Sequence, residues 1–269
     1  MMLRGASAEA QAGLRAAIDS AGASSADLAT LGDDLLGAAA VFRAEPGLRR
    51  VATDQSLDAS AKAGLVRQVF DGKISAGGLD LVADAGTRRW TTTRDLADVL
   101  EHLGVVAVAK SAGGDAGRLA DELFAVSQLV AENADLRSAL SEPTRSAADK
   151  AGLLQGLLDG KALAATQRLA GLALNGSHRT VSVALDEYQK VAASVKDESV
   201  AKVRVARPLT DADRDRLQNA LARQYGRPVH LNVSVEPGLV GGMRVEIGDD
   251  VIDGSVSSRI DDARRRLAG

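Results

Sequence analysis

The chain has 269 residues, of which 45% are hydrophobic and 26% charged, and its formal net charge is −3. This length allows two or three domains, and the mild negative charge gives no general attraction to nucleic acid. Cysteine is absent, which excludes disulfides and thiolate metal sites and favours an intracellular location. No apolar run is long enough to cross a bilayer, so we expect any membrane association to go through a protein partner.

Aromatic residues make up only 2% of the chain, so its core must consist mainly of Ala, Leu and Val. Ala and Leu have high helix propensities, and small side chains allow helices to approach closely. The composition therefore predicts helical bundles rather than a β-sandwich.

An internal repeat organises the first two thirds of the chain. A shift of 88 residues aligns three blocks in one register without a gap. The aligned blocks are Leu48-Arg49 with Leu136-Arg137, Lys62-Ala63-Gly64-Leu65 with Lys150-Ala151-Gly152-Leu153, and Asp71-Gly72-Lys73 with Asp159-Gly160-Lys161. We therefore predict two copies of one unit, over residues 1–104 and 105–196.

Each copy has the hydrophobic spacing of short helices. In the first copy, we expect a helix that begins at a Ser25 cap and ends at Pro46. A shorter helix over about 58–70 is expected to end at Asp71-Gly72, because glycine suits the left-handed conformation at a helix C-terminus. The corresponding end in the second copy is Asp159-Gly160.

The last helix of the second copy has the clearest pattern. Apolar residues three or four positions apart run from Val181 to Val195, and Thr180 or Ser177 could cap the helix. Each copy is therefore predicted to be a small bundle of short helices.

The hydrophobic period changes after about residue 197. The expected elements are a strand over 200–205, a helix over 211–225 between Thr210 and Gly226, strands over 229–235 and 243–247, and a helix over 255–267. Residues 197–269 should thus form a small α+β domain. The predicted fold is mainly α, with two consecutive small helical bundles followed by this domain.

No group of residues in the sequence forms a recognisable catalytic, cofactor or metal site. The glycine-rich stretch at 238–242 precedes a strand, whereas a phosphate-binding loop precedes a helix, so we expect a bulge. Asp249, Asp250 and Asp253 lack the rest of a calcium loop and are expected to form a polar turn and a helix cap. The three histidines lie in different segments, away from acidic residues at metal-ligand spacing. The possibility of a catalytic triad whose residues are dispersed through the sequence stays open.

The segment from Val235 to Val256 resembles the C-terminal signature of ATP synthase delta subunits, also called oligomycin-sensitivity-conferring proteins. It reads VEPGLVGGMRVEIGDDVIDGSV, and the family has an apolar residue, a Gly pair, an alternating strand, Gly-Asp and Ile-Asp-Gly-Ser in this order. The signature residues are Gly241, Gly242, Gly248, Asp249, Asp253, Gly254 and Ser255. The resemblance over the helical bundles is weaker.

This resemblance implies a non-catalytic stator subunit of a bacterial proton-translocating rotary ATP synthase, without a cofactor. In the family, the bundle domain holds the N-terminal helices of alpha subunits in the alpha/beta catalytic head. The C-terminal module binds the b-type peripheral stalk. The resemblance thus implies a peripheral location at the cytoplasmic face of the cell membrane, with no membrane insertion and no nucleic-acid partner.

The resemblance also suggests contact residues. An alpha-subunit helix is expected to bind the second copy between the helices near 116–132 and 180–195. The candidates are Leu119, Leu123, Tyr188 and Val191, although for each one alone a place in the bundle core is favoured. The stalk is expected at Val251, Ile252 and Val256.

The chain differs from the short members of that family, which have a single bundle, and resembles longer, actinobacterial-type members. The second copy adjoins the C-terminal module and should be equivalent to the usual bundle, while the role of the first copy stays open. The main alternative is a free helical-repeat adaptor unrelated to the synthase. It would explain the duplication but not the C-terminal signature, and an enzyme ranks third.

Overall fold

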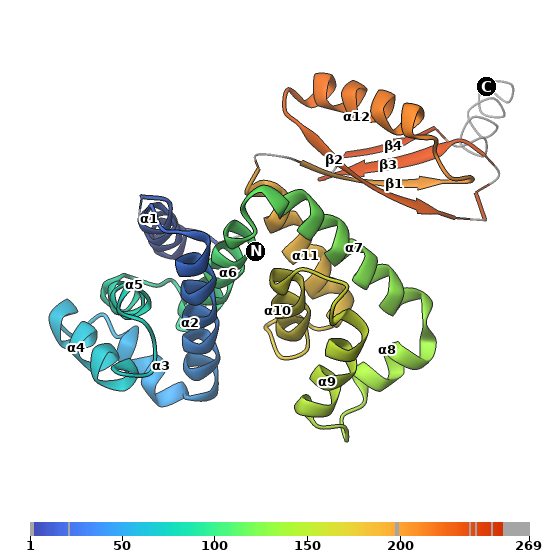
Figure 1. Cartoon of the computed structure of the whole chain (residues 1–269). Helices are drawn as coiled ribbons and strands as arrows, with labels where there is room; N and C mark the ends of the chain where they lie inside the picture. The colour runs from blue at the N-terminus through green and yellow to red at the C-terminus, as the bar shows by residue number, and fades with distance from the viewer. Residues whose placement is uncertain are drawn as a thin grey trace, which may run out of the picture. The chain divides into compact units, whose positions relative to one another are not determined.

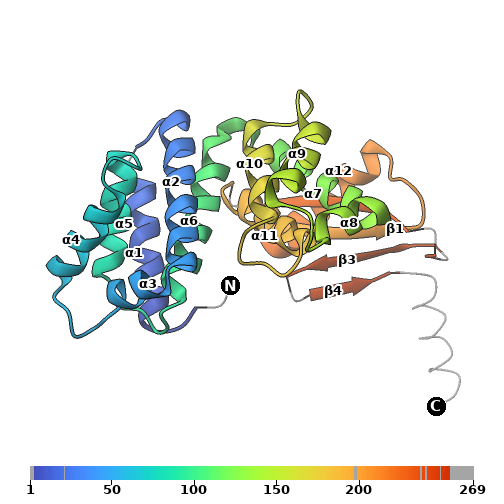
Figure 2. The same cartoon turned by 90° about the horizontal axis from the view of Figure 1, so that it is seen from below.

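The computed structural model describes residues 3–20, 22–196, 199–236, 238–239, 241–248 and 250–254 (Figures 1 and 2). The chain divides into two compact units, Met1–Val191 and Ala192–Gly269. Helices make up the first unit, and a four-stranded sheet with a long helix makes up the described part of the second. The prediction of a mainly α fold with a C-terminal α+β region is confirmed.

The helices before the sheet are short and follow one another closely. They are α1 (Ala6–Ser20), α2 (Ser25–Ala44), α3 (Pro46–Ala52), α4 (Ala59–Phe70), α5 (Ala76–Thr87), α6 (Asp95–Ser111), the 3₁₀ turn η1 (Gly113–Asp115), α7 (Ala116–Glu132), α8 (Ala134–Ser141), α9 (Ala147–Leu158), α10 (Ala164–Ala173) and α11 (Val181–Ser194).

The start of α2 differs by one residue from the prediction. Ser24, not Ser25, is the N-cap: its hydroxyl accepts from the Asp27 N–H, and the Asp27 carboxylate accepts from the Ser24 N–H. The reciprocal pair requires an acidic residue three positions after the cap, and Ser25 has Leu28 there. At the other end, Pro46 begins α3, where its missing N–H costs nothing.

The predicted ends of α4 and α9 are confirmed. Gly72 and Gly160 have φ of 68° and 67°, in the left-handed region that favours glycine. Thr180 caps α11, because its hydroxyl accepts from the Val183 N–H at 3.3 Å.

The 88-residue repeat of the sequence is also present in the structure. Helix α4, shifted by 88 residues, begins and ends at the same positions as α9. With the same shift, α3 begins where α8 begins, and α5 begins where α10 begins. A side-chain contact repeats as well. Arg49 donates to the carbonyl of Arg43 at 3.3 Å, and Arg137 donates to that of Ala131 at 2.6 Å.

Helix α6 has two counterparts in this repeat. Shifted forward by 88, α1 overlaps α6, and shifted back by 88, α11 also overlaps α6. The helix contacts α1, α2 and α5 of the first bundle as well as α7 and α10 of the second. It is therefore buried along most of its length. The boundary predicted after residue 104 lies inside this continuous helix.

The C-terminal unit is a four-stranded sheet, ordered β2-β1-β3-β4, with α12 (Asp211–Tyr225) on one face (Figure 1). Its strands are β1 (Ser199–Val205), β2 (Val229–Val235), β3 (Met243–Ile247) and β4 (Asp250–Asp253). Strand β1 pairs parallel to β2 and antiparallel to β3, and β4 pairs antiparallel to β3. Leu221 of α12 packs with the buried residues of the sheet, among them Val203 and Val245.

The prediction for α12 is confirmed at both ends, with Thr210 as N-cap and Gly226 in the left-handed conformation. Asp250 and Asp253, predicted to form a polar turn and a helix cap, lie in β4. Sequence reasoning missed this strand because it is only four residues long. Asp249 and the helix predicted over 255–267 lie outside the described residues.

Candidate partner-binding surfaces

The four residues proposed to bind an alpha-subunit helix lie on α7 and α11. Leu119 and Leu123 are fully buried, Tyr188 is nearly so, and Val191 is half-buried. Three of the four side chains thus contribute to the core of the second bundle. Their packing holds α7 and α11 in place, but these three side chains contribute little to the exposed surface of the helices.

Two exposed apolar residues lie on the same pair of helices. Leu129 of α7 is 42% exposed and Val183 of α11 is 50% exposed. The hydroxyl of Ser127 donates to the Asp186 carboxylate at 3.3 Å and so links these helices. The name α7–α11 surface is used here for the exposed side chains of Leu129 on α7 and Val183 on α11.

Sequence reasoning missed Leu129 although a signal was present. The buried residues of α7 fall at 116, 119, 120, 123, 126, 127 and 130, and Leu129 lies off this stripe. An apolar residue outside the helical period is a candidate surface contact. In the first copy, Val41 stands at the equivalent position and is also exposed.

The residues proposed to bind the stalk lie on the edge strand β4. Val251 is 53% exposed and Ile252 is 39% exposed. Their neighbours Asp250 and Asp253 flank them, and the Tyr225 hydroxyl of α12 donates to Asp250 at 3.2 Å. This places an apolar pair at the rim of the sheet. Val256 lies outside the described residues.

The signature glycines determine the path of the chain around β3. Gly241, Gly242 and Gly248 have φ of 113°, 83° and 58°, which side chains rarely allow. Gly254 closes the β3–β4 hairpin, because its N–H donates to the Met243 carbonyl at 2.9 Å. Asp253 faces Arg244 in the strand register, while Ser255 lies outside the described residues. The described residues of the signature thus have roles in backbone geometry and strand pairing.

The pKa values of His102 on α6 and Tyr188 on α11 are shifted by burial. Burial lowers the pKa of His102, and the charge of Arg15 lowers it further. Burial, with the nearby charge of Glu101, raises the pKa of Tyr188. Both shifts favour the neutral form, as expected where a helix bundle desolvates a polar side chain.

The described part of the chain contains no helix with the length and hydropathy of a membrane span. Within the same residues, no three histidine, aspartate or glutamate side chains gather closely enough to hold a metal ion. The fold defines a class: a mainly helical protein with a small α+β module, with exposed apolar residues on α7, α11 and β4.

Comparison with known proteins gives the family. The sequence model of the ATP synthase delta (OSCP) subunit family matches residues 104–267. Proteins called ATP synthase subunit delta match nearly the whole chain. The one from a Nocardioides species is 58% identical over 99% of this chain and 98% of its own. That of Streptomyces avermitilis is 40% identical over the whole of both chains. The chain belongs to the ATP synthase delta (OSCP) subunit family.

A chain in the cryo-EM structure of the Toxoplasma gondii mitochondrial ATP synthase hexamer has a TM-score of 0.32 and 16% identity to this chain. The match covers 57% of this chain and 97% of that one.

Proposed function

We propose that this chain is the stator subunit that links the alpha/beta catalytic head of a proton-translocating rotary ATP synthase to its b-type peripheral stalk. Similarity along the whole chain to proteins called ATP synthase subunit delta carries this proposal. The subunit is non-catalytic and lies peripherally at the cytoplasmic face of the cell membrane. Its task is to keep the head from turning with the central shaft.

The two partners bind different units. The second bundle, residues 105–196, holds the N-terminal helix of an alpha subunit, and the C-terminal module, residues 197–269, holds the stalk. The family match over residues 104–267 covers both parts. A stator must dissociate slowly under torque, and an amphipathic helix laid on an apolar surface provides such an interface.

Contact residues are proposed for each partner. For the alpha-subunit helix, Leu129 and Val183 make the direct contact, and the residues Leu119, Leu123, Tyr188 and Val191 support it from within. For the stalk, Val251 and Ile252 make the contact, together with Val256. The exposure of the apolar side chains on α7, α11 and β4 supports this assignment.

The experiment measures binding of the full-length chain to two probes. One is a peptide of the alpha-subunit N-terminus, and the other is the C-terminal part of the b-type stalk protein. We expect Leu129→Asp to weaken binding of the alpha peptide by at least about tenfold and to leave stalk binding unchanged. Val251→Asp should weaken binding of the stalk protein by at least about tenfold and leave binding of the alpha peptide unchanged.

Matched controls separate loss of contact from general damage. Val41→Asp places the same charge at the equivalent position of the first copy, and Val235→Asp places it on an exposed residue of β2. Both variants should bind like the original chain. Equal losses from Leu129→Asp and Val41→Asp would refute the α7–α11 surface but not the stator role. If neither probe binds the original chain, the free-adaptor alternative gains instead.

A further inference from the structure

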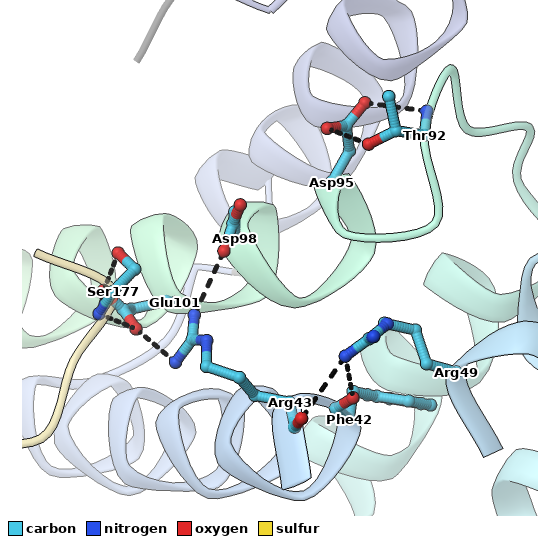
Figure 3. Close-up of polar contacts among 8 residues, drawn as sticks. All are labelled: Phe42, Arg43, Arg49, Thr92, Asp95, Asp98, Glu101 and Ser177. Carbon is cyan, nitrogen blue, oxygen red and sulfur yellow. Dashed lines mark hydrogen bonds and ion pairs between the residues drawn. The ribbon is translucent and has the colours of Figure 1, made fainter. Parts of the chain in front are cut away.

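Glu101 lies on α6, where the two copies meet, and its side chain is only 4% exposed. Its two carboxylate oxygens accept from the backbone N–H of Ser177 at 3.1 Å each, and one accepts from the Ser177 hydroxyl at 2.7 Å. Arg43 Nη1 lies 2.7 Å from the other oxygen (Figure 3). One carboxylate thus joins α2 of the first copy to the segment before α11 of the second.

The repeat indicates that this contact is specific to the junction. When α6 is compared with α1, Glu101 corresponds to Gly13, and Gly176 corresponds to Arg88. A Cβ at Gly13 would lie 2.2 Å from Arg88 Nη1, so the first copy pairs a glycine on the helix with a large residue after α5. The second copy reverses the sizes, with Glu101 on the helix and Gly176 in the facing segment.

Gly176 lets that segment approach α6. A Cβ there would lie 2.9 Å from the Tyr188 hydroxyl oxygen and 3.2 Å from a Glu101 carboxylate oxygen. A side chain at position 176 would therefore push the segment away from Glu101.

The contact is also missing when α6 is compared with α11. Here Glu101 corresponds to Gln189, and Arg43 corresponds to Ala131. A glutamine and an alanine cannot form an ion pair. Neither counterpart of Glu101 can therefore form this contact. The copies are also joined by an ion pair between Arg168 of α10 and Asp33 of α2, at 3.3 Å, but both of these side chains are more exposed than that of Glu101.

A buried carboxylate is costly unless charged or polar partners compensate its lost hydration. Here Arg43 comes from one copy and the Ser177 donors from the other, so moving the copies apart would leave Glu101 uncompensated. We propose that Glu101 is a coupling residue, which makes α2 of the first copy and residues 174–180 of the second open as one unit. The extra copy is then a rigid extension of the second, whichever partners the chain binds.

Hydrogen exchange on the full-length chain tests this coupling. In Glu101→Gln, we expect the amides of residues 175–180 to exchange at least about tenfold faster, while those of α10 keep their rates. The matched control is Asp98→Asn. Asp98 also contacts Arg43, at 3.2 Å, and Figure 3 draws no bond between Asp98 and Ser177. It should leave exchange of this segment unchanged.

A double-mutant cycle distinguishes coupling from a purely structural role. The variants are Arg43→Gln and Ser177→Ala, which change one partner in each copy. The unfolding equilibrium constant of the double variant should differ by at least about fivefold from the value expected if the two single effects were independent. In the Glu101→Gln background, this difference should vanish.

Two outcomes would overturn the proposal. One is unchanged exchange of residues 175–180 in folded Glu101→Gln. The other is independence of the Arg43 and Ser177 variants in the original chain, and this second measurement decides the matter if Glu101→Gln does not fold.

Discussion

Asp34 and Glu122 hold the same position in the two copies, and each carboxylate accepts from a backbone N–H 41 residues further along the chain. The donors are Ser75 at 3.1 Å and Leu163 at 2.8 Å. These residues precede α5 and α10, whose first N–H groups have no partner within the helix. A negative charge at this end also interacts favourably with the helix dipole.

Removing either carboxylate should destabilise its bundle. We expect Asp34→Ala and Glu122→Ala each to lower the free energy of unfolding by about 1–2 kcal/mol, because each removes the acceptor of a backbone N–H just before a helix. Urea unfolding followed by circular dichroism measures the loss. Glu132→Ala is the control: this exposed acid lies at the C-terminal end of α7, and its removal should change stability by less than about 0.5 kcal/mol. A loss in Glu132→Ala equal to the others would contradict the contribution of these two hydrogen bonds.

The crossing of α2 and α6 depends on Gly32. A Cβ there would lie 2.6 Å from Val108 Cγ2 and 3.1 Å from the Val108 backbone nitrogen. Gly32→Ala should therefore cost about 1–3 kcal/mol of unfolding free energy, because the helices must move apart. Gly37→Ala, on the same helix with open space around it, should instead stabilise by up to about 1 kcal/mol. Thermal or urea unfolding of the two variants shows whether their effects have opposite signs.

Two glycines, one within α9 and one just after it, should also respond in opposite directions. Gly160 has φ of 67°, so Gly160→Ala is expected to cost about 1–2 kcal/mol. Gly152 lies within α9 with nothing near its missing side chain, so Gly152→Ala should gain about 1 kcal/mol. The measurement is the midpoint of urea unfolding. Stabilisation by Gly160→Ala would mean that the chain leaves α9 by another path.

The lowered pKa of His102 leads us to expect a loss of folding stability in mild acid. Its pKa in the folded chain is lowered from 6.5, mainly by burial, so the unfolded chain takes up a proton first as the pH falls. The contribution of the neutral side chain is therefore complete above pH 6.5 and is lost as the pH falls below 6.5 toward the lower, folded pKa.

Replacement of this histidine tests the prediction. Leu14 stands at the equivalent position of α1, so His102→Leu introduces the side chain that the repeat already uses. The stability of this variant should fall less than that of the original chain between pH 6.5 and about 5. Parallel pH profiles for the two proteins, measured by urea unfolding, would refute the contribution of His102.

The sequence by itself determined the features that depend on neighbouring residues. The ends of α4 and α9 at Gly72 and Gly160, and the limits of α12 at Thr210 and Gly226, follow from capping and from glycine's freedom to take positive φ. The 88-residue repeat was visible because both copies keep the same local elements. The family signature was visible because its glycines have fixed backbone roles.

Only the tertiary structure decided which surfaces are free and how the copies join. The helical period shows that Leu119 and Leu123 share a face, but burial depends on the other helices that cover that face. Strand β4 exists because β3 offers it backbone partners, and four residues carry too little pattern to predict this. The double role of α6 is likewise a matter of long-range contacts: one helix can complete two bundles only where segments distant in sequence pack on both of its sides.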